Sequence, residues 1–90
     1  MYRIRFFKDK KGNEPVLDYI RELQSKDDKN NRIKSEKILN YMDVLRRDGT
    51  RAGQPYVKHV EGEIWELRPL RDRVLFVGWK NGTFVLLHHL

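Results

Sequence analysis

The fold of this 90-residue chain is decided by the segment Glu63–Val77, which reads EIWELRPLRDRVLFV. Apolar and charged residues alternate along Glu63–Arg68, as they do in a strand with one buried face. A short charged connection follows, and Asp72–Lys80 is apolar on both faces, as in a central strand of a sheet. The segment therefore predicts a β-hairpin that carries three arginines at one end.

Side-chain directions on the hairpin follow from the two-residue period of a strand. Trp65 and Leu67 point to one face, which suits a hydrophobic core. Glu66 and Arg68 point to the opposite face, where they are neighbours. Both faces of the following strand are largely apolar, so parity leaves the direction of Arg73 open.

Three further strands are expected from alternating patterns and turn residues. They are Tyr2–Phe7, Tyr56–Val60 and Thr83–Leu90. The Asn81-Gly82 pair before the last strand is a strong signal for a tight hairpin turn.

Two helices are expected between the first strand and the others. The first begins with Asn13 as its cap and ends near Ser25, and its apolar residues are Val16, Leu17, Ile20 and Leu23. The second follows the polar stretch Lys26–Asn31 and ends at Gly49, a residue that readily adopts the left-handed conformation of a helix end. Its apolar face is expected to consist of Ile33, Ile38, Leu39, Met42 and Leu45.

The resulting order is β-α-α-β-β-β-β, which indicates an α+β fold within one domain spanning residues 1–90. The last four strands are expected to form an antiparallel meander. The two helices would pack on one face of the sheet, and the other face would be partly open to solvent.

Composition limits the classes of function. The chain carries 19 Lys+Arg against 13 Asp+Glu, a net charge of +6, which favours a polyanionic partner, although solubility alone could explain it. A domain this small favours a shallow groove and a polymeric ligand. With no cysteine, thiolate metal sites and thiol nucleophiles are excluded. No membrane span or signal peptide is predicted, so a cytoplasmic location is the default expectation.

Three arginines at the hairpin end are the main candidate site. Arg68, Arg71 and Arg73 suit phosphate binding, because the planar guanidinium donates two parallel hydrogen bonds and stays charged. The alternative is a solvated turn in which Glu66 and Asp72 form surface ion pairs of at most about 1 kcal/mol each.

Other polar residues border the same region. Tyr56, Lys58 and His59 lie on or next to the strand before the hairpin, and His88 and His89 close the chain. Adjacent strand residues point to opposite faces, so at most one of the last two histidines faces the site. A histidine there could transfer a proton near neutral pH, although a packed, hydrogen-bonded role is the commoner one. No metal-ligand spacing or phosphate loop is present, so no cofactor is expected.

Several motifs together resemble a known family. They are the Ile64–Leu70 stretch IWELRPL, the Arg73–Val77 stretch RVLFV, the Asn81-Gly82 turn, the Val85–His89 stretch VLLHH and Pro15-Val16 before the first helix. With the element order, they resemble the HigB branch of the RelE/ParE toxin superfamily, the phage-derived Gp49-like group. The resemblance covers nearly the whole chain.

This resemblance implies the toxin of a type II toxin–antitoxin system, an mRNA interferase that enters the ribosomal A site and cuts the mRNA there. The implied endoribonuclease chemistry needs no metal: the 2′-hydroxyl attacks the adjacent phosphate. The implied partner is a HigA-like antitoxin with a helix-turn-helix domain, and DNA would be contacted only through that antitoxin.

The resemblance also implies roles for individual residues. Arg73 and Arg68 would bind the scissile phosphate, and Glu66 would be the base or would orient Arg68. His88 or His89 would be the acid. The implied RNA contacts are Tyr56, Lys58, His59, Arg71 and Lys80.

Similar proteins continue beyond this point into a basic C-terminal segment that helps to bind RNA. The present chain stops at Leu90, so weak or absent RNA cleavage is expected of this form. Two other functions stay open: inhibition of gyrase without nuclease activity, as in the ParE branch, and a basic module that binds protein or RNA without catalysis.

Overall fold

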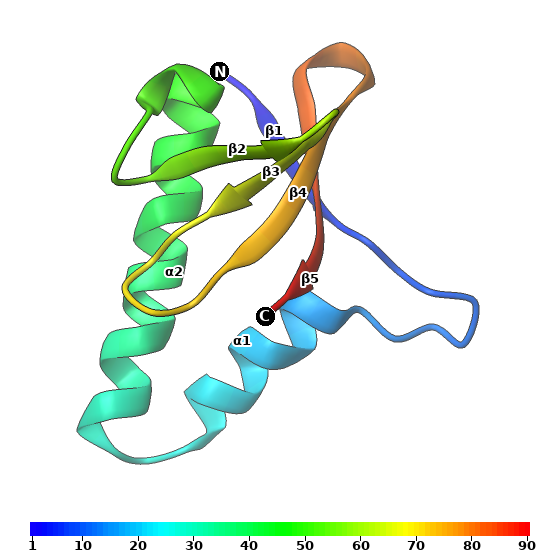
Figure 1. Cartoon of the computed structure of the whole chain (residues 1–90). Helices are drawn as coiled ribbons and strands as arrows, with labels where there is room; N and C mark the ends of the chain where they lie inside the picture. The colour runs from blue at the N-terminus through cyan, green and yellow to red at the C-terminus, as the bar shows by residue number, and fades with distance from the viewer.

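The computed structural model describes residues 1–90 and contains the predicted elements in the predicted order (Figure 1). These are β1 (Arg3–Phe6), α1 (Pro15–Ser25), α2 (Lys29–Asp48), β2 (Val57–Glu61), β3 (Ile64–Leu67), β4 (Val74–Trp79) and β5 (Thr83–His89). Single turns of 3-10 helix follow α2 and β4. The α+β prediction is therefore confirmed.

The five strands form one sheet in the order β1-β5-β4-β3-β2, so β4 is the central strand, as predicted. Strands β2 to β5 form the expected antiparallel meander. The strand β1, however, pairs in parallel with β5, with Arg3 opposite Thr83. The sheet is therefore mixed, because the helical hairpin carries the chain from β1, at one edge of the sheet, to β2, at the opposite edge.

Both helices cover one face of the sheet, and the other face is left uncovered (Figure 1). The core between these layers consists of Val16, Ile20, Leu23, Ile38, Met42, Leu45, Val57, Leu67, Val74, Phe76, Phe84 and Leu86. Neither helix is long and apolar enough to cross a membrane.

The apolar face of α2 is narrower than predicted. Its buried residues are Ser35, Ile38, Met42 and Leu45, which recur at intervals of three and four residues. Ile33 and Leu39 are 41% and 37% exposed. At 100° per residue, Ile33 points about 160° away from the centre of the buried stripe, and Leu39 lies at its edge, about 80° from the centre, so neither belongs to the buried face.

The helix starts differ from prediction, by one residue in α1 and by three in α2. Glu14, not Asn13, is the cap of α1. Asn13 belongs to the preceding turn, where its backbone N–H donates to Asp9 Oδ1 at 2.8 Å. Helix α2 begins at Lys29, where Asp28 accepts a hydrogen bond from the backbone N–H of Asn31 at 2.9 Å.

Turn residues fix the ends of α2 and β4. Gly49 ends α2 with φ +63°, as expected, and a Cβ there would lie 2.7 Å from Cε2 of Tyr2. Asn81 and Gly82 have φ values of 58° and 67°, the conformation predicted for the last hairpin. Strands β3 and β4 are shorter than predicted, so the whole Arg68–Arg73 segment is the connection between them.

Candidate phosphate-binding site on the open sheet face

The cross-strand register assembles a row of side chains on the face that the helices leave open. Lys58 on β2 pairs with Glu66 on β3, Glu66 pairs with Leu75 on β4, and Leu75 pairs with His88 on β5. Residues opposite one another in neighbouring strands share a face. The predicted orientation of Glu66, away from buried Leu67, is therefore confirmed.

Two arginines converge on the Glu66 carboxylate. The Nε atoms of Arg68 and Arg73 lie 3.4 and 3.8 Å from Glu66 Oε1. The Glu66 side chain is only 16% exposed. This geometry resolves the direction of Arg73, which lies on the open face with Glu66. Two cations against one anion leave a local excess of one positive charge, which favours an anionic ligand.

The connection between β3 and β4 holds Arg73 in place. Its Nη1 donates to the carbonyl oxygens of Leu70 and Asp72 at 3.0 and 2.8 Å. The connection turns at Leu70, which has a φ of +56°. Because Nη1 is tied to backbone oxygens, Arg73 has a fixed orientation while its Nη2 donors stay free.

Arg68 is free to bind a ligand. Its Nε is buried and has no hydrogen-bond partner, since Glu66 at 3.4 Å lies outside good hydrogen-bond geometry. Its terminal nitrogens form no hydrogen bond within the chain. The two guanidinium groups therefore offer unused donors side by side, an arrangement that suits a phosphate.

A hollow of about 270 Å³ lies beside this arginine pair. It is lined by Tyr41 from α2, by Gln54 and Pro55 from the segment before β2, and by Arg68, Leu70 and Arg73 from the connection between β3 and β4. The hollow was not predicted, because its walls come from three segments that are distant in the sequence.

The three predicted site residues on or next to β2 lie on different sides of the sheet. Tyr56 packs edge-on against Tyr41, with 4.9 Å between ring centroids, and Lys58 is exposed on the open face. His59 pairs with Trp65 on the helix-covered side, where the two rings lie 5.0 Å apart and His59 Nε2 lies 2.6 Å from the carbonyl oxygen of Gly62. Lys58 therefore borders the arginine pair, whereas His59 does not.

The two histidines near the end of the chain lie on opposite faces of the sheet. His88 is exposed on the open face, in the row with Leu75. His89 pairs with buried Val74 on the opposite side and stacks on Tyr19, with 3.7 Å between ring centroids and 8° between planes. Burial, followed by the charge of His88, lowers the pKa of His89. Of the two, only His88 shares a face with the arginines.

Asp72 is not the solvated turn residue of the alternative interpretation. It is 7% exposed, and the Tyr19 hydroxyl donates to its Oδ1 at 2.7 Å. Lys34 Nζ lies 3.9 Å from the same oxygen. Burial and the bond to Asp72 raise the pKa of Tyr19. These partners lie in α1 and α2, so no local pattern could have revealed them.

Arg71 and Lys80 lie outside the arginine pair. Arg71 is exposed beside Lys34 and Asp72, on the far side of the β3–β4 connection. Lys80 lies at the other end of β4, with its Nζ 5.8 Å from the centre of the Trp79 ring. Lys80 follows Arg73 by seven residues, about 23 Å along a strand at roughly 3.3 Å per residue.

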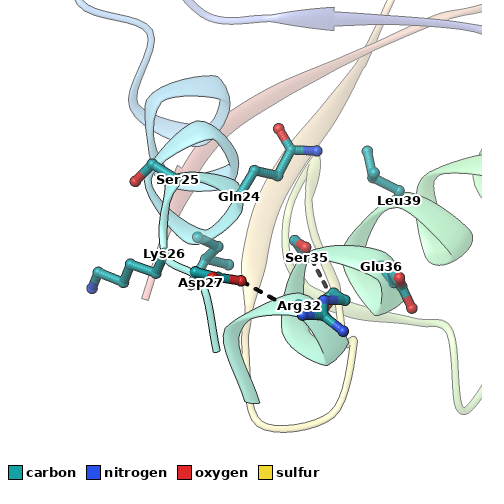
Figure 2. A pocket seen from close by; sticks show the side chains of 9 residues that line it. Gln24, Ser25, Lys26, Asp27, Arg32, Ser35, Glu36 and Leu39 are labelled. Atoms are coloured by element: carbon teal, nitrogen blue, oxygen red, sulfur yellow. Dashed lines mark hydrogen bonds and ion pairs between the residues drawn. The ribbon is translucent and has the colours of Figure 1, made fainter. Parts of the chain in front are cut away.

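A second hollow, of about 310 Å³, lies at the turn between α1 and α2 (Figure 2). Its charges are balanced, and Figure 2 shows Arg32 turned toward Asp27, with 3.8 Å between Nη2 and Oδ1. It therefore lacks the excess charge of the arginine pair. No three His, Cys, Asp or Glu side chains gather where they could hold a metal ion.

Comparison with known proteins identifies a family and solved structures of similar fold. The family model described as phage-derived protein Gp49-like matches residues 18–90. The crystal structure of the archaeal RelE–RelB complex from Pyrococcus horikoshii OT3 is similar in fold, with a TM-score of 0.64 and 20% identity over 98% of this chain and 91% of that chain. The RelE-like fold that the sequence predicted is confirmed. No curated protein matches the sequence.

Proposed function

The chain belongs to the family of phage-derived Gp49-like proteins, and on this basis we propose that it is the toxin of a toxin–antitoxin pair and cleaves mRNA on the ribosome. One observation carries the proposal: Arg68 and Arg73 converge on Glu66 at 3.4 and 3.8 Å on the open face. Free arginine donors next to a carboxylate supply both parts that phosphodiester cleavage needs, charge stabilisation and proton transfer.

The proposed reaction is attack of an RNA 2′-hydroxyl on the adjacent phosphate. A bond forms between the 2′-oxygen and phosphorus, and the bond from phosphorus to the 5′-oxygen breaks. The proton of the 2′-hydroxyl passes to a base, and the 5′-oxygen receives a proton from an acid. Charge accumulates on the phosphate oxygens between these two steps, so fixed cations lower the barrier.

The arginines would stabilise that charge. Arg73, with Nη1 tied to two carbonyl oxygens, is held in position before RNA binds, and this avoids the cost of ordering it during the reaction. Arg68 would bind the phosphate through its free terminal nitrogens. Lys58, exposed beside Glu66 in the sheet register, would contact the neighbouring backbone.

Glu66 and His88 would move the protons. Glu66 is the carboxylate nearest the arginine pair, and it would accept the proton of the 2′-hydroxyl or orient Arg68. His88 shares the open face and would protonate the leaving oxygen, since an imidazole can donate a proton in general acid catalysis. His89, stacked on Tyr19, would not reach the phosphate.

The proposed partner is an antitoxin with a helix-turn-helix domain, which would bring the only contact with DNA. The net charge of +6 favours association with an acidic surface as well as with RNA. A ribosomal target places the toxin in the cytoplasm. Copurification of this chain with the product of an adjacent small gene would test the partnership.

Cell-free translation tests the proposed reaction directly. Because weak cleavage is expected of this form, we expect a small number of new 5′ ends in a reporter mRNA, mapped by primer extension after prolonged incubation, when the protein and ribosomes are both present. The same mRNA without ribosomes should stay intact. Inhibition of gyrase supercoiling by the protein, with no cleavage of translated mRNA, would contradict the proposal and favour a ParE-like activity.

A further inference from the structure

The hollow beside the arginine pair is not explained by phosphate binding alone. Arg68 and Arg73 both line it, so a group attached to the bound phosphate can enter it. Its volume of about 270 Å³ is below the roughly 300–1,000 Å³ of pockets that hold drug-sized ligands. The hollow therefore suits one ring system.

The walls of the hollow suit a flat, unsaturated ring. Tyr41 lines it from α2, and Tyr56 supports that ring in an edge-on contact, with 62° between planes. Pro55 and Leu70 contribute apolar walls. Unpaired nucleobases stack on aromatic side chains of this kind, whatever their identity.

One side chain in the hollow can read the edge of a ring. The Gln54 amide forms no hydrogen bond within the chain, and the residue is exposed. An amide offers both donors and an acceptor, and it can pair in a bidentate manner with a base edge. No other residue that lines the hollow has an amide side chain.

We propose that this hollow binds the nucleobase of the nucleotide whose phosphate lies on Arg68 and Arg73, with Tyr41 against the face of the base and Gln54 at its edge. Gln54 is then a specificity-determining residue. The inference rests on the proposed function, because it takes the arginines as the phosphate site. It adds which other part of the nucleotide is recognised and by which residues.

Binding of mononucleotides tests the inference without ribosomes or cleavage. The probes are the four nucleoside 3′-monophosphates and inorganic phosphate, titrated into the full chain and followed by NMR. We expect at least one nucleotide to bind about five-fold or more tightly than phosphate. Equal affinity for phosphate and all four nucleotides would overturn the inference.

Two sets of variants assign the contacts. Tyr41→Leu should lose about five-fold or more of the affinity for every nucleotide, whereas Tyr41→Phe keeps the ring and should keep the affinity. Gln54→Ala should reduce the ratio between the best and the worst nucleotide about five-fold or more. Gln24→Ala, in the hollow of Figure 2, is the matched control and should change neither quantity.

Mapping of cleavage sites separates this inference from the proposed function. If the protein cuts mRNA, Gln54→Ala should broaden the base distribution at the cut sites while total cleavage continues. Unchanged cut sites and unchanged nucleotide selectivity in Gln54→Ala would refute base reading and leave the nuclease intact. Selective nucleotide binding by a protein that cuts no mRNA would refute the nuclease and support the base site.

Discussion

Glu66 is the residue on which the proposed site depends, because one carboxylate oxygen faces two arginines. Such a carboxylate has two effects of opposite sign on RNA. Under the proposed function it would repel the phosphate, and it would also hold Arg68 and Arg73 in a geometry suited to binding the phosphate. If it also accepts the proton, its removal should affect catalysis and binding in opposite directions.

Substitution Glu66→Gln separates these effects. We expect RNA to bind at least as tightly, because the repulsion is removed, and cleavage to fall about 100-fold or more, because an amide cannot accept the proton. Cleavage rates and RNA affinity, measured in parallel, check this. Glu36→Gln, at an exposed position of α2, is the matched control. Full cleavage by Glu66→Gln would remove the base role.

His89 should make the stability of the fold depend on pH. Burial lowers its pKa below the ordinary value of 6.5, so the unfolded chain binds this proton more readily than the folded chain. Its contribution is complete above about pH 6.5 and is lost as the pH falls through the folded-state pKa. Urea unfolding should show a lower midpoint at pH 5.5 than at pH 7.5.

The variant His89→Gln isolates that contribution, because it removes the titrating ring and leaves the carboxylates unchanged. The difference in urea midpoint between the two pH values should shrink in this variant. An undiminished difference would mean that other groups cause the pH dependence.

At the scale of elements, the connection between β3 and β4 is fixed by helix α1. The Tyr19 hydroxyl donates to Asp72 Oδ1 at 2.7 Å, and Asp72 directly precedes Arg73. A buried carboxylate that loses its donor destabilises the fold by about 1–3 kcal/mol. The same bond therefore connects the stability of the fold with the orientation of Arg73.

Removal of the Tyr19 hydroxyl tests how much its hydrogen bond to Asp72 stabilises the fold. Tyr19→Phe should lower the free energy of unfolding by about 1–3 kcal/mol in urea titrations. Tyr2→Phe is the control, because the Tyr2 ring packs on Phe84 and its hydroxyl forms no hydrogen bond within the chain. A Tyr19→Phe protein as stable as the Tyr2→Phe protein would show that the bond contributes nothing.

The elements themselves were largely predictable, because alternation and helical spacing are local properties. The same rule oriented Glu66 and Arg68. Alternation could not orient Arg73, because both faces of β4 are apolar. The register between β3 and β4 and the contact of Arg73 with Glu66 show that Arg73 lies on the open face. Parallel pairing of β1 and the burial of Asp72 arise from contacts distant in the sequence, such as the 53 residues between Asp72 and Tyr19.

In the whole molecule, the two faces of the sheet have different roles. The helices and one face of the sheet form the core, while the other face carries the row from Lys58 through Glu66 to His88. Under the proposed function, the net charge of +6 would support long-range attraction to RNA, and the arginine pair would provide the local binding. If long-range attraction alone mattered, the loss of any surface arginine would reduce cleavage equally. If the arginine pair forms a specific site, the loss of Arg73 would reduce cleavage far more.

Ribosome-dependent cleavage by Arg73→Ala is the most direct test of this distinction, with Arg21→Ala on α1 as the variant of equal charge. Both proteins should be folded, and primer extension should count the cut mRNA in cell-free translation. We predict that Arg73→Ala loses about 100-fold or more of the cleavage rate, while Arg21→Ala keeps the rate of the unaltered protein. Full cleavage by Arg73→Ala, or an equal loss in both variants, would contradict the arginine pair as the catalytic phosphate site.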